Sequence, residues 1–415
     1  MFENSNIIAG LEIGTSKICV AIGELNADGV LTIIGVGQAL SHGVRKGEIV
    51  NPDRVAEDLR AAIFEAEQMA NVEIRSVFLG VTGGHLHGFN SRGMHSVVSD
   101  DHEISQVDVD DVVKNAKAIN LPPENIVLHA IRQLFHVDGQ AGVTNPVGML
   151  GARLEVDMHI IHGHGNRLQN AVRLVRGTAL AVDDVVFNGL ASALALLTVE
   201  QKELGALVID IGGGTTDYLV YSDGVIRHSG VLAVGGDHVS NDLAYGLKIS
   251  LRRAEKLKIE HGSALVNEAA QDQTISLTDE LGQELKRIKA KHIQIIMSER
   301  LGELLKLIAR DLEQTCLSHY LRAGVFITGG GSRVPGLATL ARNVFQMNVT
   351  TGHAIAISGL ANALNQPEFT TAIGLVKYGA SRRRKPSPFS FPAMLKKWGA
   401  NIAAFLKGII KRLGD

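Results

Sequence analysis

The sequence predicts an α/β protein with two domains, because one short pattern occurs twice in a chain too long for one ordinary core. Residues 11–17 read LEIGTSK, and residues 209–217 read IDIGGGTTD. Each is an apolar strand that ends in an acid, turns on glycine and hydroxyl residues, and resumes as a second strand. The chain has 415 residues, and single cores rarely grow beyond about 250–300 residues. The repeat therefore indicates two halves of one fold that hold one ligand between them.

The residue types in these hairpins indicate a ligand that carries phosphate. Glycine reaches positive φ and lets backbone N–H groups approach phosphate oxygens. Threonine adds hydroxyl donors. An acid repels phosphate, so Glu12 and Asp210 are expected to hold Mg²⁺, directly or through its water shell.

The bulk composition excludes several classes of protein. A net charge of −2 with 20% charged residues gives no overall attraction to nucleic acid or to a membrane, so any such attraction must be local. Cys19 and Cys316 cannot form a disulfide framework, which fits a reducing cytosol. Residues 1–8 lack the features of a secretory signal, and no apolar run approaches the ~18 residues of a spanning helix.

Periodicity and turn residues predict the elements in order. Strands are expected at 7–13, 18–24, 31–37, 76–82, 152–162, 183–186 and 324–328, and helices at 52–70, 167–176, 189–198 and from His238, with a charged helical block over 250–320. Asn51 is the expected N-cap of the first helix, and Asp28-Gly29 marks a tight turn. Residues 84 to about 163 are rich in His and Asp, which indicates an inserted subdomain.

The glycine motifs and two alanine-rich helices together resemble a known superfamily. Residues 12–15, 210–217 and 326–332, followed by Pro335-Gly336-Leu337, resemble the phosphate-1, phosphate-2 and adenosine motifs of the actin/Hsp70/sugar-kinase ATPases. Residues 191–197 and 372–375 resemble its two connecting helices. The resemblance implies the actin-like ATPase fold, with two RNase H-like cores, and implies ATP and Mg²⁺ as cofactors.

The resemblance also implies which positions contact the nucleotide. They are Gly14, Thr15, Ser16, Lys17, Gly212, Gly213, Gly214, Thr215, Thr216, Gly235, Gly236, Glu255, Lys258, Gly329, Gly330, Gly331 and Ser332. Glu255 is the implied ribose contact and Lys258 an implied cation. The helix that carries both is highly charged, so a solvated surface is the alternative interpretation of that pair.

Two departures from the superfamily pattern bear on catalysis. Glu12 stands where most members have Asp, and Cys19 where a Lys is usual; Lys17, on the same strand face, is the substitute cation. Asn188 stands where a Glu or Gln orients the attacking water, and an amide cannot take up the proton. With Asp210, Glu12 and Asn188 as the catalytic candidates, we expect tight ATP binding and weak or absent hydrolysis.

Residues 391–415 form a separate segment behind a basic, proline-bearing linker at 381–390. Its apolar positions follow helical spacing and its other face is basic, which is typical of a helix that lies on an anionic membrane surface. The candidate membrane residues are Trp398, Ile402, Phe405, Leu406, Ile409, Ile410, Lys396, Lys397, Lys407, Lys411 and Arg412. A terminal helix docked on its own core is the alternative, while nucleic acid is disfavoured because the aromatics are not interleaved with the cations.

The insert position and the tail make the chain similar to the FtsA family of bacterial cell-division actin homologues. Residues 79–86 and 145–154 resemble the segments that open and close the FtsA insert. The resemblance implies self-assembly into filaments, tethering of FtsZ at the cytoplasmic face of the membrane at the division site, and contacts of the insert with later division proteins. It nominates Arg300 for the FtsZ C-terminal tail, with Lys289 and Lys291 as neighbours; an ordinary exposed arginine is the alternative.

The expected domain boundaries follow from these assignments. They are 1–83, 164–203 and 360–380 for the first core, 84–163 for the insert, 204–240 and 322–359 for the second core, and 241–321 for an outer subdomain.

Two rival functions remain at this point. One is a pilus-assembly actin-like adaptor, which has no need of a lipid-binding tail. The other is a sugar or acid kinase, which would need sugar-binding residues and a catalytic Asp.

Histidines are concentrated in the insert. Nine of the sixteen fall between 85 and 164: His85, His87, His95, His102, His129, His136, His159, His162 and His164. Neither a cysteine nor a fixed spacing with carboxylates accompanies them, so we expect surface and core histidines rather than zinc ligands.

Overall fold

The first core contains a six-stranded sheet whose parallel strands end at the cleft. In a computed structural model that describes residues 6–267, 273–278, 284–355, 357–360 and 366–384, the strand order is β11-β6-β1-β2-β3-β19. The strands are β1 (Ile7–Ile13), β2 (Lys17–Leu25), β3 (Leu31–Leu40), β6 (Ser76–Val81), β11 (Ala181–Phe187) and β19 (Ser358–Gly359), with a separate small pair, β4 (Val44–Arg45) and β5 (Glu48–Ile49). β1 to β3 form an antiparallel meander, whereas β1, β6 and β11 run parallel. The parallel strands therefore end at one edge of the sheet, where α/β folds place ligands.

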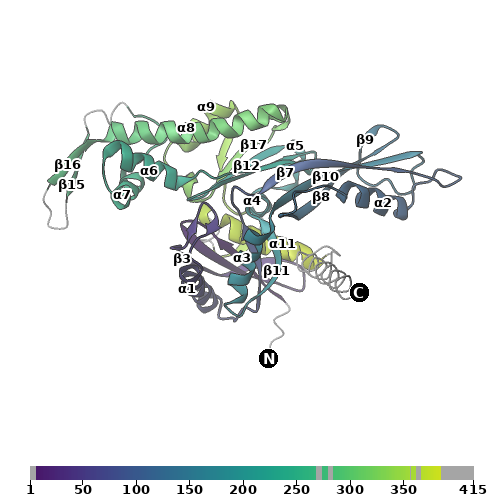
Figure 1. The fold of residues 1–415 in the computed structure, drawn as a ribbon, viewed down its shortest axis with the longest axis horizontal. Coiled ribbons are helices and arrows are strands. Elements are labelled where there is room, and N and C mark those ends of the chain that lie inside the picture. The colour runs from purple at the N-terminus through teal and green to yellow at the C-terminus, as the bar shows by residue number, and fades with distance from the viewer. Residues whose placement is uncertain (1–5, 268–272, 279–283, 356, 361–365, 385–415) are drawn as a thin grey trace, which may run out of the picture.

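Two pairs of helices cover the two faces of this sheet (Figure 1). α1 (Pro52–Ala70) and α3 (Gly165–Arg176) contact each other and one face, and α4 (Asn188–Leu196) and α11 (Thr370–Arg384) pack together on the other. Asn51 caps α1 as expected, because its side-chain oxygen accepts a hydrogen bond from Arg54 N at 3.2 Å. α11 continues to Arg384, so the first four residues of the expected linker are helical.

The second core repeats the hairpin-and-parallel-strand plan. Its sheet has the order β14-β13-β12-β17-β18, formed by β12 (Ala206–Ile211), β13 (Thr216–Ser222), β14 (Val225–Leu232), β17 (Gly324–Thr328) and β18 (Val349–Thr351). β12 pairs antiparallel with β13 and parallel with β17. The short α5 (Val199–Leu204) contacts β13, α9 (Leu337–Phe345) contacts β18, and α4 reaches from the first core to contact β12. Three 3₁₀ turns, η3 (Ser318–Tyr320), η4 (Gly330–Arg333) and η5 (Pro367–Phe369), connect these elements.

The outer subdomain forms an arm on the far side of the second core (Figure 1). It consists of α6 (Gly236–Leu247), α7 (Leu251–His261), α8 (Ala290–Gln314) and the hairpin β15 (Thr274–Thr278) and β16 (Glu284–Lys289). The charged helical block expected over 250–320 is therefore helical in α7 and α8, but the expectation was wrong for the hairpin between them. Residues 284–289 read ELKRIK, with apolar residues three apart, so sequence spacing does not reveal this strand, which pairs antiparallel with β15.

The insert is an antiparallel sheet with one helix. Its strands have the order β7-β10-β8-β9: β7 (His87–Ser96), β8 (Asn125–Val137), β9 (Gln140–Val143) and β10 (Arg153–His164). The helix α2 (Gln106–Lys117) packs on β7 and β10 and begins at a capping box between Ser105 and Asp108. The insert therefore has its own apolar cluster, which includes Phe135 and Leu154.

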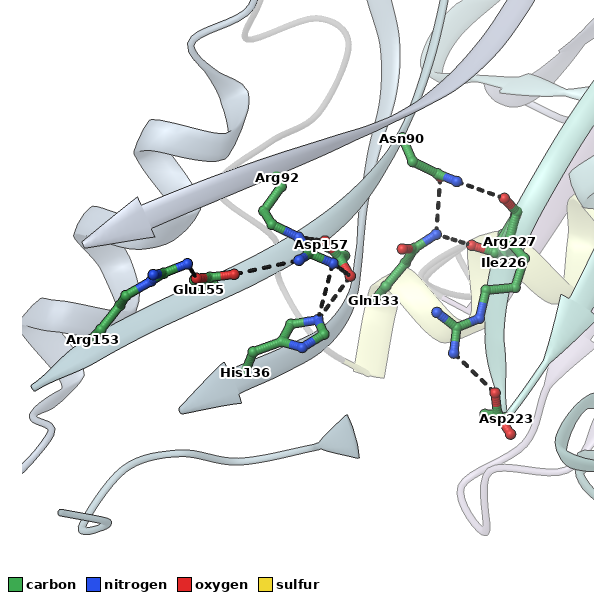
Figure 2. A network of polar contacts seen from close by, with 10 residues as sticks. All are labelled: Asn90, Arg92, Gln133, His136, Arg153, Glu155, Asp157, Asp223, Ile226 and Arg227. Carbon is green, nitrogen blue, oxygen red and sulfur yellow. Dashed lines mark hydrogen bonds and ion pairs between the residues drawn. The ribbon is translucent and has the colours of Figure 1, made fainter. Parts of the chain in front are cut away.

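The insert is bonded to the second core as well as being continuous with the first. Figure 2 shows Asn90 and Gln133 of the insert facing β14, the edge strand of the second sheet. Asn90 Nδ2 donates to the carbonyl oxygen of Arg227 at 2.9 Å, and Gln133 Nε2 donates to that of Ile226. The buried His159 lies between Asn90 Oδ1, at 2.8 Å, and Ser229 Oγ, at 2.7 Å. These side chains satisfy carbonyls that an edge strand otherwise leaves unpaired.

A candidate nucleotide site between the two cores

The two acid–glycine hairpins face each other across the cleft at very short range. Each turn is closed by a backbone hydrogen bond, Gly14 N to Lys17 O at 3.0 Å and Gly212 N to Thr215 O at 2.9 Å. A Cβ added to Gly214 would lie 2.5 Å from Thr15 Oγ1. Only glycine therefore allows the second hairpin to approach the first this closely.

A cavity of about 420 Å³ lies between the hairpins and contains most of the expected nucleotide residues. The expected residues that line it are Glu12, Gly14, Thr15, Ser16, Lys17, Asn188, Asp210, Gly212, Gly213, Thr215, Gly236, Glu255, Lys258, Gly329, Gly330 and Gly331. Four others lie beside it. Gly214 packs on the opposite hairpin, Thr216 donates to Val234 O at 2.8 Å, Gly235 precedes α6, and Ser332 donates to Gly329 O at 2.7 Å.

Three carboxyl groups of the two hairpins line this cavity: Asp210 and Asp217 are buried, and Glu12 is half-buried. Burial raises the pKa of Glu12 to about 7, with Asp210 raising it further and Lys17 opposing the shift. Burial also raises the pKa of Asp210, although the hydroxyls of Ser192 and Thr371 donate to its Oδ2 at 2.6 and 2.8 Å. The third group, Asp217, has a pKa well above its usual range because of burial. Such a concentration of buried negative charge favours a cation.

The position of Glu12 fits a magnesium ion. Its Oε2 is buried and is one of four buried side-chain atoms in the described part of the chain without a hydrogen-bond partner. Mg²⁺ takes oxygen ligands and retains waters, which suits an unpartnered carboxylate that faces a cavity. Glu12 and Asp210, which lie near the ends of the corresponding strands β1 and β12 of the two cores, are therefore the groups that would hold it.

Lys17, the substitute cation, and Asn188, which stands in place of the usual Glu or Gln, both line the cavity. Lys17 Nζ contacts the carbonyl oxygen of Glu368 and lies 5.3 Å from the centre of the Phe369 ring. Asn188 begins α4 and is buried, and its Oδ1 has no partner in the described chain. A Cβ on Gly80 would lie 2.5 Å from that oxygen, so Asn188 is packed against β6.

The residues expected to contact the ribose and base also line the cavity. Lys258 Nζ lies 2.7 Å from Glu255 Oε2 and donates to Gly236 O at 3.1 Å, so this pair is not merely a solvated face. Gly329 has φ +79°, and a Cβ there would lie 2.2 Å from Asp210 Oδ1. The third glycine motif is therefore packed directly behind the phosphate-2 acid.

Sequence reasoning missed several residues that line the same cavity. They are Gln38, Thr82, Asp217, Asp237, Arg333, Glu368 and Thr371. Thr82 donates to Asp217 Oδ1 at 2.6 Å, which links the end of the first-core strand to the second hairpin. Asp217 could have been found from the sequence, because it is the last residue of the repeated pattern at 209–217. The other residues belong to separate elements that meet at the cavity only in the folded chain.

The candidate partner residues do not gather at one place. Arg300 lines a groove of about 640 Å³ on the outer subdomain, together with Asp242, Tyr245 and Leu307. Arg300 Nη2 donates to Asp242 Oδ1 at 3.1 Å, and Arg300 Nε donates to Asp242 Oδ2. These hydrogen bonds raise the pKa of the Arg300 guanidinium above its ordinary value. Lys289 ends β16 and Lys291 lies in the first turn of α8, and neither lines the groove.

The insert histidines serve as hydrogen-bonding and core groups. His129 Nε2 accepts from Phe187 N at 3.0 Å, and burial lowers its pKa to about 3. His136 and His95 contact Asp157 and Asp108, each at 2.9 Å. Across the described ranges, no cluster of three or more His, Cys, Asp or Glu residues is arranged to hold a metal ion.

The candidate membrane residues lie in 391–415, outside the described residues. Among the helices that the structure does describe, none combines the length and the apolar character that crossing a bilayer requires.

Comparisons with known proteins agree with this architecture. A family model described as "Cell division protein FtsA" matches residues 207–374, and one described as "SHS2 domain inserted in FTSA" matches residues 83–162. Cell division protein FtsA of Escherichia coli (strain K12) is 36% identical over 416 residues, which cover 99% of this chain and 97% of that protein. The FtsA of Pseudomonas aeruginosa is 36% identical over 381 residues, covering 92% and 91%.

Solved structures share the fold at low sequence identity. A chain of a PilM–PilN type IV pilus biogenesis complex has a TM-score of 0.64 at 16% identity, covering 90% of this chain and 98% of that one. MreB 5 of Spiroplasma citri, bound to AMPPNP, has a TM-score of 0.54 at 16% identity, covering 92% and 98%. Two cores with facing hairpins and an insert after β6 define an actin-like ATPase fold. Within that class, the chain belongs to the FtsA family.

Proposed function

We propose that this protein binds ATP with Mg²⁺ in the cleft between its cores. The observation that carries the proposal is the pair of hairpins facing each other across a cavity of about 420 Å³, with Glu12, whose Oε2 is unpartnered, among its lining residues. Lys17 and the glycine turns would neutralise and cradle the phosphates, and Gly329–Gly331 would lie against the ribose and base. Mg²⁺ would supply charge neutralisation at the phosphates.

Titration of the protein with a fluorescent ATP analogue, with Mg²⁺ and with EDTA, tests this site. Saturable binding that ATP displaces and that weakens in EDTA is expected. Competition by GTP as strong as that by ATP would contradict an adenosine site at Gly329–Gly331.

The chain is further proposed to act as a structural adaptor of the bacterial division ring rather than as an efficient enzyme. Its relatives are named cell division proteins, and their match covers nearly the whole chain. In this proposal the protein polymerises, binds the FtsZ C-terminal tail, contacts later division proteins through the insert, and attaches through 391–415 to the cytoplasmic face of the membrane.

Flotation on anionic vesicles, with full-length protein and with residues 1–390, tests the membrane attachment. Truncation after residue 390 leaves α11 complete.

The groove around Arg300 is the proposed FtsZ site. It combines exposed apolar side chains, such as Tyr245 at 89% exposure, with the basic Arg300, Lys306 and Arg310. Arg300→Glu is expected to reduce co-sedimentation with FtsZ strongly. The control is Arg252→Glu on α7, away from this groove, which makes the same charge change and is expected to keep FtsZ binding. Equal FtsZ binding by both variants would remove Arg300 from the proposal.

A further inference from the structure

The edge of the first core opposite the nucleotide cavity is where the described chain ends. The parallel strands β1, β6 and β11 begin at this edge, and their other ends lead to the cleft. α11 also ends there, at Arg384. Residues 385–390 then separate this point from the segment 391–415.

Five arginines lie where β11, β6 and β1 begin, on both faces of the sheet, and we call them the basic corner: Arg75, Arg173, Arg176, Arg382 and Arg383. Arg75 immediately precedes β6, and its carbonyl oxygen accepts from Ala181 N, the first residue of β11, at 2.9 Å. Arg173 and Arg176 lie in the last turn of α3, which leads into β11.

The last turn of α11 completes the corner. Arg382 Nη2 lies 3.7 Å from Asp184 Oδ2 on β11, and Arg383 Nη2 donates to the carbonyl oxygen of Ile7 on β1 at 2.8 Å. Three segments far apart in sequence therefore bring positive charge to one place, beside the point where the tail leaves.

The corner is basic although the chain carries a net charge of −2. Arg75, Arg173, Arg176 and Arg383 are exposed. Residues 165–182 contain no acid. The acids of the corner are Glu73, Asp183 and Asp184; Asp183 accepts from Ser76 Oγ at 2.7 Å and Asp184 is buried beneath Tyr378. Glu24, on β2, is the register partner of Ile7, so it borders the corner beside Arg383.

We propose that the basic corner contacts an anionic lipid surface beside the tail and fixes the orientation of the folded body on it. This inference rests on the proposed membrane attachment. Six residues span at most about 20 Å, so a tail lying on a membrane keeps the corner near that surface. Arginines within a Debye length of about 8 Å are attracted by anionic headgroups. The cleft then faces away from the lipid, open to the cytoplasm.

Flotation on phosphatidylglycerol-containing vesicles, with the full chain, tests the corner. Replacing Arg75, Arg173 and Arg176 together by Ala is expected to weaken vesicle binding at least about tenfold, because each such residue contributes on the order of a fivefold gain near an anionic surface. Replacing the same three by Lys keeps the charge and the binding. The matched control replaces the exposed Lys114, Arg252 and Lys256 by Ala, which removes equal charge elsewhere.

The outcomes separate the corner from the tail. Full-length protein that does not float contradicts the membrane attachment and the corner with it. Full-length protein that floats, with the corner and control variants floating equally, contradicts the corner alone. A corner variant that floats normally but no longer sediments as a polymer without vesicles would make this surface a contact between copies of the chain instead. Equal flotation on phosphatidylcholine vesicles would exclude headgroup charge as its ligand.

Discussion

At the scale of single residues, Glu12 combines burial, an unpartnered oxygen and a raised pKa. Its environment favours the neutral acid when no cation is present, so the residue is poorly accommodated as a carboxylate until a cation approaches. In the proposed phosphate site, this would allow a carboxylate beside the ligand and would connect its protonation to ligand binding.

Stability of the nucleotide-free protein should therefore depend on pH through Glu12. Its folded pKa of about 7 exceeds its ordinary value of 4.5, so the folded state binds more protons and loses stability as pH rises from 4.5 through 7. Glu12→Gln, which cannot ionise, is expected to stabilise the protein by roughly 3 kcal/mol at pH 8 and far less at pH 5. Thermal unfolding at both pH values, without nucleotide, measures this; an equal effect at both would contradict it.

We expect the magnesium dependence of ATP binding to require the Asp210 carboxylate. Asp210→Asn keeps the size of the side chain and an oxygen that can accept from Ser192 and Thr371, but removes the charge. We expect affinity for Mg²⁺-ATP to fall about tenfold or more and Mg²⁺-free binding to change little. The control is the exposed Asp28→Asn. An equal loss with and without Mg²⁺ would show that Asp210 acts only on the fold.

Hydrolysis should be slow because Asn188 cannot act as a base. Its oxygen is packed against β6 and has no donor in the described chain. Turnover below roughly one per second is expected for the purified protein. Phosphate release under saturating Mg²⁺-ATP measures it, and sustained turnover of many per second would refute this assignment.

At the scale of elements, β14 joins the nucleotide hairpin to the insert. β14 pairs with β13, which carries Asp217, and its carbonyls accept hydrogen bonds from the insert residues Asn90 and Gln133 (Figure 2). The insert thus contacts both cores, and a change in the cleft angle between them must either move it or break these bonds.

Loss of the Gln133 amide should destabilise this contact. Gln133→Ala leaves the carbonyl of Ile226 buried without its donor, so unfolding free energy is expected to fall by about 1–3 kcal/mol. Gln140→Ala, at an exposed position of the same sheet, is the matched control. Denaturant unfolding that gives equal midpoints for both variants would show that the contact contributes nothing.

At the scale of the whole molecule, the proposed attachment through residues 391–415 should be weak for one copy and stronger after assembly. A single basic amphipathic segment binds marginally, whereas many segments on one polymer bind firmly through effective concentration. Vesicle binding is therefore expected to rise more than proportionally with protein concentration when ATP is present. A strictly proportional rise across the range where the protein polymerises would contradict this.

Much of this arrangement was predictable from local pattern. β1, β17 and α1 lie where their apolar runs and the Asn51-Pro52 start place them, because such runs and helix caps act over a few residues. The hairpin β15–β16 was mistaken for helix, since a short charged strand has a weak signal. Thr82 and Thr371 were missed because they meet Asp217 and Asp210 of the second core only in the folded chain.

The sequence by itself determined the repeated acid–glycine hairpins, the insert after β6, and the basic tail, because glycine, charge and periodicity express their preferences locally. Only the tertiary structure decided that Gly214 packs on Thr15, that Thr82 donates to Asp217, and that the arginines of α3, α11 and the start of β6 share one corner. These contacts join residues far apart in the chain, and sheet pairing and helix packing, rather than any local preference, bring them together.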